Sequence, residues 1–562
     1  MKDFSKAIIE CVPNFSEGVN MHVIKQITDE IEKIEGVSLL DVDPGKATNR
    51  TVVTFVGNPN AAVEACFQAI KKASELIDMR HHKGEHPRMG ATDVCPLIPV
   101  SGITMAETVE FAKILAKRVA DELHIPTYLY EYAQENFARK NLAEIRSGEY
   151  EGLAAKMQKP EWKPDYGDTT FNERSGATVI GARDFLIAYN VNLNTTSTRR
   201  ANSIAFDIRE KGRQKKDEKG KAIKDAAGNP LWEAGLLKSV KAIGWFIEEY
   251  GVAQISINLT NMHDTPLHQL FDTCCERATA RGLRVTGSEL VGLVPLEAML
   301  EAGKYFLRKQ QRSVGVSESE LIKIAVKSMG LDELAPFDPQ KKIIEYQLQK
   351  SSAKKLVKMN LQQFAEETAS ESPAPGGGSI AAYCGAMGAA LATMVANLSS
   401  HKAGWDARWE EFSNHAEKGQ AIVKQLLNLV DEDTDAFNQI MAAFGLPKNN
   451  DAEKAARKNA IEAATINAIK VPFKTMELAF ESFELAKAMA EIGNPNSVSD
   501  AGVGALCARA AVKGAYLNVK INAQDLTENP LVKPLLEQAE KMNLAADEKE
   551  KEVWNVVLSK IK

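Results

Sequence analysis

The stretch from Ala7 to Val56 reads AIIECVPNFSEGVNMHVIKQITDEIEKIEGVSLLDVDPGKATNRTVVTFV and decides the fold of the N-terminal part. Apolar runs at Ala7–Val12, Val37–Val42 and Thr51–Val56 have the composition of strands. Between the first two runs, Val23–Ile34 repeats apolar residues with helical spacing. The predicted order is therefore strand, helix, strand, strand.

The alternation continues with a helical pattern at Ala61–Ile77, a strand at Val94–Val100, a helix near Glu107–Leu123 and strand formers at Thr127–Tyr132. This order approximates β-α-β-β-α-β, the split unit of ferredoxin-like folds, in which helices cover one face of a sheet. After a break at Pro160–Gly167 a similar pattern follows, with a polar helix candidate between its first two strands. Its other segments are predicted at Thr178–Leu193, Val240–Glu248, Gln254–Leu259, Leu267–Ala280 (a helix) and Leu283–Gly287.

We therefore predict two tandem ferredoxin-like α/β sandwich subdomains, residues 1–185 and 186–347. Inside the second, Arg209–Lys224 is dense in charged residues and contains two glycines. We interpret it as a solvated hairpin or mobile loop, and the alternative is a charged lid over an anionic ligand. The stretch continues to Leu231, and we refer to Arg209–Leu231 as the charged insertion.

From about Ser352 the sequence is rich in alanine and helical in period, which predicts a linker at 348–355 and an all-α helical bundle over 356–562. The chain is thus expected to be α+β and then all-α. Ile380–Leu398 carries no charge and nearly reaches the length of a membrane span, but its Ala, Gly and Met content favours a buried helix over membrane insertion.

Composition excludes several classes of protein. The 69 Lys and Arg against 75 Asp and Glu give a net charge of -6, so no broad basic surface for nucleic acid is expected. The seven cysteines form no Cys-x-x-Cys pair, which argues against a disulfide framework or a zinc ribbon. With no apolar leader after Met1, we expect a cytoplasmic protein.

The loop Arg80–Gly90 contains three histidines, several cations and a carboxylate. Pro87 restrains the backbone of His86, which suits an imidazole that transfers protons. A surface turn of solvated histidines is the alternative, and His82 with His86 would be a weak zinc pair. Asp41 and Asp43 share one face of a strand end, where one could orient a histidine or both could simply begin a turn.

The glycine loop Pro373–Ser379 opens a helix whose N-terminus could hold an anionic or planar ligand, although a flexible linker explains it equally. Further on, a helical wheel places four adjacent acids around a predicted helix, and Asp433 is the one that faces the apolar side. Burial should raise the pKa of Asp433, as a general acid or base requires, and the alternative is an Asp held by a buried hydrogen bond. The apolar arc comprises Leu426, Leu429, Val430, Ala436, Phe437 and Ile440.

Three motifs, Glu10–Gly18, His82–Gly90 and Pro373–Ser379, together resemble those of formimidoyltransferase-cyclodeaminase, the bifunctional folate enzyme family of histidine degradation. The resemblance covers nearly the whole chain. It implies transfer of a formimino group from N-formimino-L-glutamate to tetrahydrofolate, and then cyclisation of 5-formimino-tetrahydrofolate to 5,10-methenyl-tetrahydrofolate with release of ammonia. Neither step requires a metal.

The resemblance also implies roles for individual residues. His86 would be the acid/base of the transferase, with Asp43 as orienting partner and His82 as a weaker candidate. Asp433 would be the general acid of the cyclodeaminase, a residue that the helical wheel selects independently. The folate-binding stretch of the family maps onto Gly167, Asp168, Thr169, Thr170, Phe171, Asn172, Glu173, Arg174, Ser175 and Gly176.

Lys83, Arg88 and Arg174 are candidate partners for the carboxylates of either substrate. Family members assemble as rings of dimers, so a homo-oligomer is expected, and polyglutamate tails of the folate would keep the intermediate near both sites. Two alternatives remain open: an enzyme in which only the cyclodeaminase or a cyclohydrolase half is active, and a folate-binding scaffold without turnover.

Overall fold

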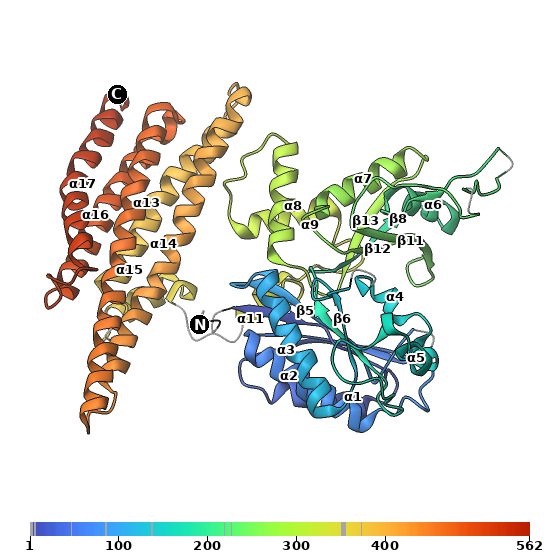
Figure 1. Cartoon of the computed structure of the whole chain (residues 1–562). Helices are drawn as coiled ribbons and strands as arrows, with labels where there is room; N and C mark the ends of the chain where they lie inside the picture. Colours follow the sequence, from blue (N-terminus) through green and yellow to red (C-terminus); the bar gives the residue numbers. More distant parts are fainter. Residues whose placement is uncertain are drawn as a thin grey trace. The chain divides into compact units, whose positions relative to one another are not determined.

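The computed structural model describes residues 4, 7–46, 48–84, 87–136, 139–218, 220–225, 228–349, 356–372 and 374–561. The chain divides into two compact units. The first unit runs to Ala298 and includes Met329–Lys350; the second comprises Met299–Ser328 and Ser351–Lys562. An N-terminal α/β region followed by a helical region is confirmed (Figure 1).

The first sheet has the order β3-β4-β1/β2-β5-β7-β6. Neighbouring strands are antiparallel from β3 to β5, whereas β7 runs parallel to both β5 and β6. The strands are β1 (Ile8–Cys11), β2 (Asn14–Phe15), β3 (Val37–Gly45), β4 (Arg50–Gly57), β5 (Thr92–Ser101), β6 (Thr127–Glu131) and β7 (Thr178–Ala182).

Helices α1 (Met21–Glu32), α2 (Pro59–Leu76) and α3 (Met105–Leu123) share one hydrophobic core with this sheet. Each begins at a side chain that accepts backbone N–H groups: Asn20, Asn58, and Thr104 in a capping box with Glu107. A second hydrophobic core lies on the opposite face of the sheet. It includes residues of the short helices α4 (Leu142–Arg146) and α5 (Glu149–Met157), which the sequence analysis did not predict.

The second sheet has the order β11-β12-β8-β13, and all its neighbours are antiparallel. Its elements are β8 (Ile187–Leu193), α6 (Thr198–Ile208), β11 (Val240–Ile247), β12 (Val252–Leu259), α7 (Leu267–Thr279) and β13 (Val285–Val291). The charged insertion forms a hairpin, as predicted, in which β9 (Arg213–Gln214) pairs with β10 (Trp232–Glu233). The predicted segment Thr178–Leu193 comprises two strands, because β7 joins the first sheet and β8 the second.

The second unit is built from long helices with small residues at their contacts. Gly385 and Gly388 of α13 lie against α16, and the helix is buried along most of its length. The main helices are α12 (Leu361–Thr368), α13 (Gly377–Ser400), α14 (Trp409–Phe444), α15 (Asp451–Ile492), α16 (Val498–Asn522) and α17 (Lys533–Lys560). Among the described residues α13 is the one helix long and apolar enough to cross a membrane, and 61% of its most apolar window is buried in the unit, as in a core helix.

Helix α15 continues through Pro472 without a break in its helical assignment. A proline inside a helix has no N–H for the carbonyl four residues earlier, here that of Ala468. The amide Nδ2 of Asn522, from α16, donates to this carbonyl at 2.8 Å. A side chain from the neighbouring helix thus replaces the missing backbone hydrogen bond.

The segment 299–328, which the sequence analysis assigns to the second sandwich, packs against α13 and α14. The N–H of Val314 donates to Ser413 Oγ at 3.1 Å, and Asn397 Nδ2 donates to the carbonyl of Gly315 at 2.8 Å. A Cβ on Gly315 would lie 2.2 Å from the backbone carbon of Ala416, so this contact requires glycine. Parts of α8 (Leu296–Lys309) and α9 (Glu318–Met329) therefore belong to the helical unit.

The carboxyl of Glu10 on β1 should make the stability of the first unit depend on pH, which can be tested. Its side chain is buried, and desolvation raises its pKa from 4.5 to about 7 despite the nearby charge of Arg183. Since the unfolded chain releases this proton at lower pH, the free energy of unfolding should fall as pH rises from 4.5 to about 7. Glu10→Gln should remove this dependence, which amounts to roughly 3 kcal/mol, in urea unfolding followed by the fluorescence of the first unit.

The matched control is Glu35→Gln, at an exposed position. Its pH profile should follow that of the wild type. A Glu10→Gln protein that keeps the wild-type pH dependence would show that the Glu10 carboxyl is not the titrating group.

Candidate functional site

Two stretches far apart in the sequence meet at the start of β5. Backbone hydrogen bonds join the loop before β5 to the predicted folate-binding stretch: Met79 N–H to Arg174 O at 2.9 Å, and Ala91 N–H to Ser175 O at 2.9 Å. Gly176 has φ +67°, and a Cβ there would lie 2.1 Å from the carbonyl oxygen of Met89. This close approach therefore requires glycine at 176.

Both ring nitrogens of His82 are engaged within this loop. Arg88 Nε donates to His82 Nδ1 at 3.2 Å, so Nδ1 must be the accepting nitrogen. His82 Nε2 lies 2.9 Å from the carbonyl of Asn49, in the turn between β3 and β4, and must then carry the proton that it donates there. This arrangement fixes the ring and leaves neither nitrogen free to bind a metal ion.

Arg88 is buried and paired with carboxylates of its own chain. Its guanidinium contacts Glu149 at 3.0 Å and Glu151 at 2.7 Å, and it holds the pKa of Glu151 below its usual range. The exposed Lys83 lines a pocket of about 450 Å³ beside these groups. Of the predicted carboxylate partners in this loop, Lys83 is the one that faces solvent.

The predicted acid/base His86 lies outside the described residues, and so does Glu85. Asp43, the predicted partner of His86, is exposed on the edge strand β3, opposite Val52 of β4. Asp41 is also exposed and Val42 between them is half-buried, so the two carboxylates share a face as predicted. The turn that follows Asp43 carries Asn49, which contacts His82 and also binds the carbonyl of Lys83 through Nδ2 at 2.8 Å.

A buried ion network behind the loop was not predicted. Asp93 at the start of β5 is almost fully buried; its carboxylate contacts Arg146 at 2.5 Å and Arg50 at 3.6 Å. It also accepts the N–H of Met89 at 3.0 Å, and burial lowers the pKa of Arg50 to about 10. Arg50 in turn donates to Asn14 of the Glu10–Gly18 motif at 2.8 Å. The sequence contains one sign of this network, the charged residue Asp93 directly before the apolar run that begins at Val94.

The stretch Gly167–Gly176 forms its own turns and packs on neighbouring elements. Phe171 lies against Tyr150 with ring centroids 5.4 Å apart, and Asp168 accepts the N–H of Thr170 at 2.8 Å. Arg174 binds carbonyls of Ser74 and Glu75 at the end of α2. The Arg174 guanidinium is therefore occupied by backbone in this structure.

The face of the second sheet opposite α6 and α7 carries buried amides that the sequence analysis also missed. Trp245 Nε1 donates to Gln254 at 3.1 Å, Gln254 Nε2 to Asn192 at 2.7 Å, and Asn192 Nδ2 to Glu333 at 2.8 Å. Gln254 and Asn192 are almost fully buried. The alternation of asparagines with apolar residues in β8 is the sequence feature that could have predicted these buried amides.

In the helical unit Asp433 of α14 lies against the N-terminus of α13. Ser379 Oγ donates to the carbonyl of Val430 at 2.8 Å and lies 3.2 Å from Asp433 Oδ2. A Cβ on Gly378 would lie 2.1 Å from Asp433 Oδ1, so the carboxylate occupies the space that this glycine leaves open. Desolvation raises the pKa of Asp433 although hydrogen bonds from Ser379 oppose the shift, which confirms the predicted direction.

The surroundings of Asp433 differ in two details from the helical wheel. Asp431 was predicted to point away, but it is half-buried and its Oδ1 accepts the N–H of Leu356 at 2.7 Å. Phe437 was predicted in the apolar arc, yet it is 36% exposed because no described segment covers α14 there. Glu432 and Asp435 are exposed, as predicted.

Adjacent glycines of α13 provide a matched pair of substitutions. Gly378→Ala should displace the Asp433 carboxylate and destabilise the helical unit by about 1–3 kcal/mol, because the new methyl group would overlap it. Gly377→Ala meets only the flexible end of Asn518, at 3.3 Å, and should change stability by less than about 0.5 kcal/mol. Chemical denaturation of both variants checks this, and equal stability of the two would refute the tight contact.

Known proteins resemble this chain along most of its length. Family sequence models described as "Formiminotransferase domain, N-terminal subdomain", "Formiminotransferase domain" and "Formiminotransferase-cyclodeaminase" match residues 8–183, 188–349 and 360–541. The rat formimidoyltransferase-cyclodeaminase is 43% identical over 93% of this chain and 93% of its own length.

Two shorter relatives match the two parts separately. The glutamate formimidoyltransferase of Streptococcus pyogenes is 42% identical over 54% of this chain and 93% of its own length. The methenyltetrahydrofolate cyclohydrolase of Methylorubrum extorquens is 37% identical over 36% of this chain and 97% of its own length.

Proposed function

Because the chain belongs to the formimidoyltransferase-cyclodeaminase family, we propose that it is a bifunctional folate enzyme. It transfers a formimino group from N-formimino-L-glutamate to tetrahydrofolate, and then cyclises 5-formimino-tetrahydrofolate to 5,10-methenyl-tetrahydrofolate with release of ammonia. The observation that carries this proposal is the separation of two candidate sites: the loop before β5 in the first unit, and the desolvated Asp433 in the second.

In the transfer step N5 of the folate attacks the amidine carbon of formiminoglutamate, and the C–N bond to glutamate then breaks. We assign proton transfer to His86, which takes the N5 proton and returns a proton to the departing glutamate nitrogen. The fixed ring of His82 suits positioning of the loop rather than proton transfer, since both its nitrogens are engaged. Asp43, exposed at the end of β3, remains the proposed orienting partner of His86.

Tetrahydrofolate is the proposed co-substrate, in polyglutamylated form, and no metal takes part. Its pterin would contact the stretch Gly167–Gly176, where Phe171, packed against Tyr150 of α5, offers aromatic surface beside the loop. Lys83 would pair with a substrate carboxylate. Arg88 and Arg174 could do so only after releasing their present partners, so we assign them to support of the loop.

In the cyclisation step N10 attacks the formimino carbon on N5, the proton of N10 passes to the former imino nitrogen, and the resulting amino group leaves as ammonia. Asp433 would act as the general acid that protonates this group. Burial favours the protonated carboxyl that this role needs, and Ser379 orients it through the hydrogen bond to Oδ2.

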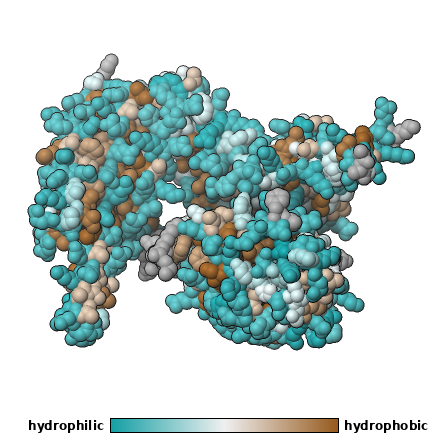
Figure 2. Space-filling view, in the orientation of Figure 1, coloured by the Kyte–Doolittle hydropathy of each residue, from teal (hydrophilic) through white to brown (hydrophobic). Residues whose placement is uncertain are grey.

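Several further proposals concern architecture. Both sheets place the first strand of a β-α-β-β-α-β sequence between its third and fourth, which supports two ferredoxin-like subdomains with boundaries near 1–185 and 186–347. We propose a homo-oligomer, a ring of dimers, since α16 exposes Val503, Leu506, Leu517 and Ile521 and Figure 2 shows hydrophobic patches on the helical unit. Seven free cysteines support a reducing, cytoplasmic location.

Single-site variants of the full chain test the bifunctional assignment. With tetrahydrofolate and formiminoglutamate, His86→Ala should lower transfer by about 10²–10⁴-fold yet still convert added 5-formimino-tetrahydrofolate. Asp433→Asn should keep transfer and accumulate 5-formimino-tetrahydrofolate. Absorbance of methenyl-folate and release of ammonia are measured together.

Three results would contradict this assignment. Folate binding without turnover in the wild type favours a scaffold. Cyclisation without any transfer favours an enzyme with only its second half active. Loss of both activities in one variant shows that the sites are not separate.

A further inference from the structure

Polar side chains of two other helices flank the first turn of α13. Asp433 of α14 fills the space beside Gly378. Asn518 of α16 lies beside the preceding residue, Gly377: a Cβ there would lie 3.3 Å from Asn518 Nδ2 and 3.8 Å from Asn518 Oδ1. Consecutive positions of a helix point about 100° apart. Asp433 and Asn518 therefore lie on neighbouring sides of one helical turn.

The amide of Asn518 is held in one orientation and keeps its acceptor available. Its Nδ2 donates to the carbonyl of Gly514, four residues earlier in α16, at 2.9 Å. In the part of the chain that the structure describes, Asn518 Oδ1 accepts no hydrogen bond. Asn518 is half-buried and Gly377 beside it is exposed. A bound molecule can therefore reach this oxygen, which accepts hydrogen bonds through two lone pairs.

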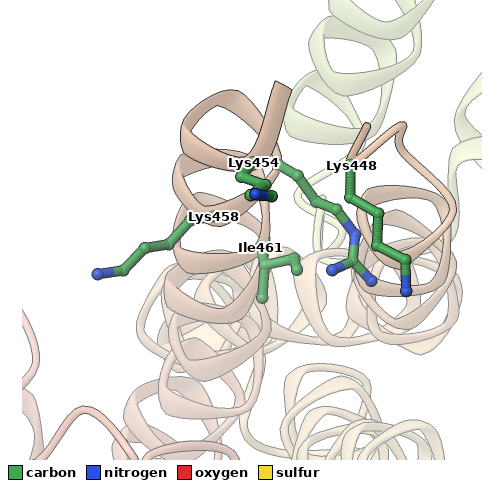
Figure 3. Close-up of a pocket in the computed structure, with 5 residues that line it drawn as sticks. Lys448, Lys454, Lys458 and Ile461 are labelled. Atoms are coloured by element: carbon green, nitrogen blue, oxygen red, sulfur yellow. The ribbon is translucent and has the colours of Figure 1, made fainter. Parts of the chain in front are cut away.

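A pocket elsewhere in the helical unit is separate from this turn. It lies where α14 meets α15, and Figure 3 shows Lys448, Lys454, Lys458 and Ile461 around it. The last residue of α14, Phe444, is about 16 Å along the helix from Asp433. In this structure the cations of that pocket are therefore too far away to contact a small group that touches Asp433.

We propose that Asn518 is a substrate-positioning residue of the cyclisation reaction, whose Oδ1 accepts a hydrogen bond from the formimino nitrogen of 5-formimino-tetrahydrofolate. The inference rests on the proposed function, in which Asp433 protonates this same nitrogen. An acceptor that binds one N–H of the nitrogen fixes its place relative to the Asp433 carboxyl, as proton transfer requires.

The proton balance of the cyclisation step is unchanged by Asn518. The nitrogen receives one proton from N10 and one from Asp433, and the C–N bond then breaks with its electron pair passing to ammonia. The amide of Asn518 neither gains nor loses a proton. Its removal should therefore slow the step through lost alignment rather than through a missing acid or base.

Steady-state cyclisation of added 5-formimino-tetrahydrofolate by the full chain tests the proposal. Asn518→Leu is similar in size but has no acceptor. It should lower kcat at least about tenfold and change KM less than about threefold, because the lost bond aligns the substrate for the reaction. Asn518→Asp keeps an acceptor oxygen in this place and should be at least about threefold faster than Asn518→Leu.

The matched control is Asn414→Leu, at an exposed position of α14, which should keep the wild-type kcat and KM. Transfer from formiminoglutamate should be unchanged in every variant. Thermal unfolding checks that each variant folds, and Asn518→Ala takes the place of Asn518→Leu if the latter does not fold.

The outcomes separate this inference from the proposed function. A wild type without any cyclisation contradicts the proposed function and the role of Asn518 with it. If the wild type cyclises, the role of Asn518 alone is overturned when Asn518→Leu keeps its kcat, when only its KM changes, when the Asn414→Leu control loses as much activity, or when Asn518→Asp is no faster than Asn518→Leu.

Discussion

The backbone contact between Met89–Gly90 and Ser175–Gly176 is the constraint on which the first candidate site depends. Without it, the histidine loop before β5 and the stretch before β7 would be separate surface segments. The contact is made of backbone hydrogen bonds and leaves no room for a side chain at Gly176, where a Cβ would lie 2.1 Å from Met89 O. Glycine is thus required by distance as well as by its positive φ.

In the helical unit, too, a close contact requires glycine, but there the contact is with a side chain. A glycine in the first turn of α13 leaves space that the Asp433 carboxylate fills, and Ser379 fixes its orientation. Two effects on the Asp433 pKa oppose each other there. Hydrogen bonds from Ser379 favour the charged form, but desolvation is the larger effect and keeps the pKa raised. A raised pKa increases the fraction of the Asp433 carboxyl that carries a proton, the form that a general acid requires.

Local patterns in the sequence predicted the long helices and most strands of the first unit, and the buried position of Asp433 on α14. Apolar runs located β1, β3 and β4, and the helical wheel selected Asp433, because both depend on neighbours within a few residues. The network of Arg50, Asp93 and Arg146 was not predictable, since its members are 43 and 53 residues apart and meet only after the sheet forms. For the same reason the sequence did not show that Arg88 is neutralised by Glu151.

The most direct test of this account is the activity of Gly176→Ala, measured for each reaction separately. We expect transfer from formiminoglutamate to fall at least about tenfold, because the added methyl group must push the stretch away from Met89. Cyclisation of added 5-formimino-tetrahydrofolate should stay at the wild-type rate, since Asp433 lies in the other unit. Unchanged transfer would contradict the claim that this contact assembles the first site, and equal loss of both activities would contradict the separation of the two sites.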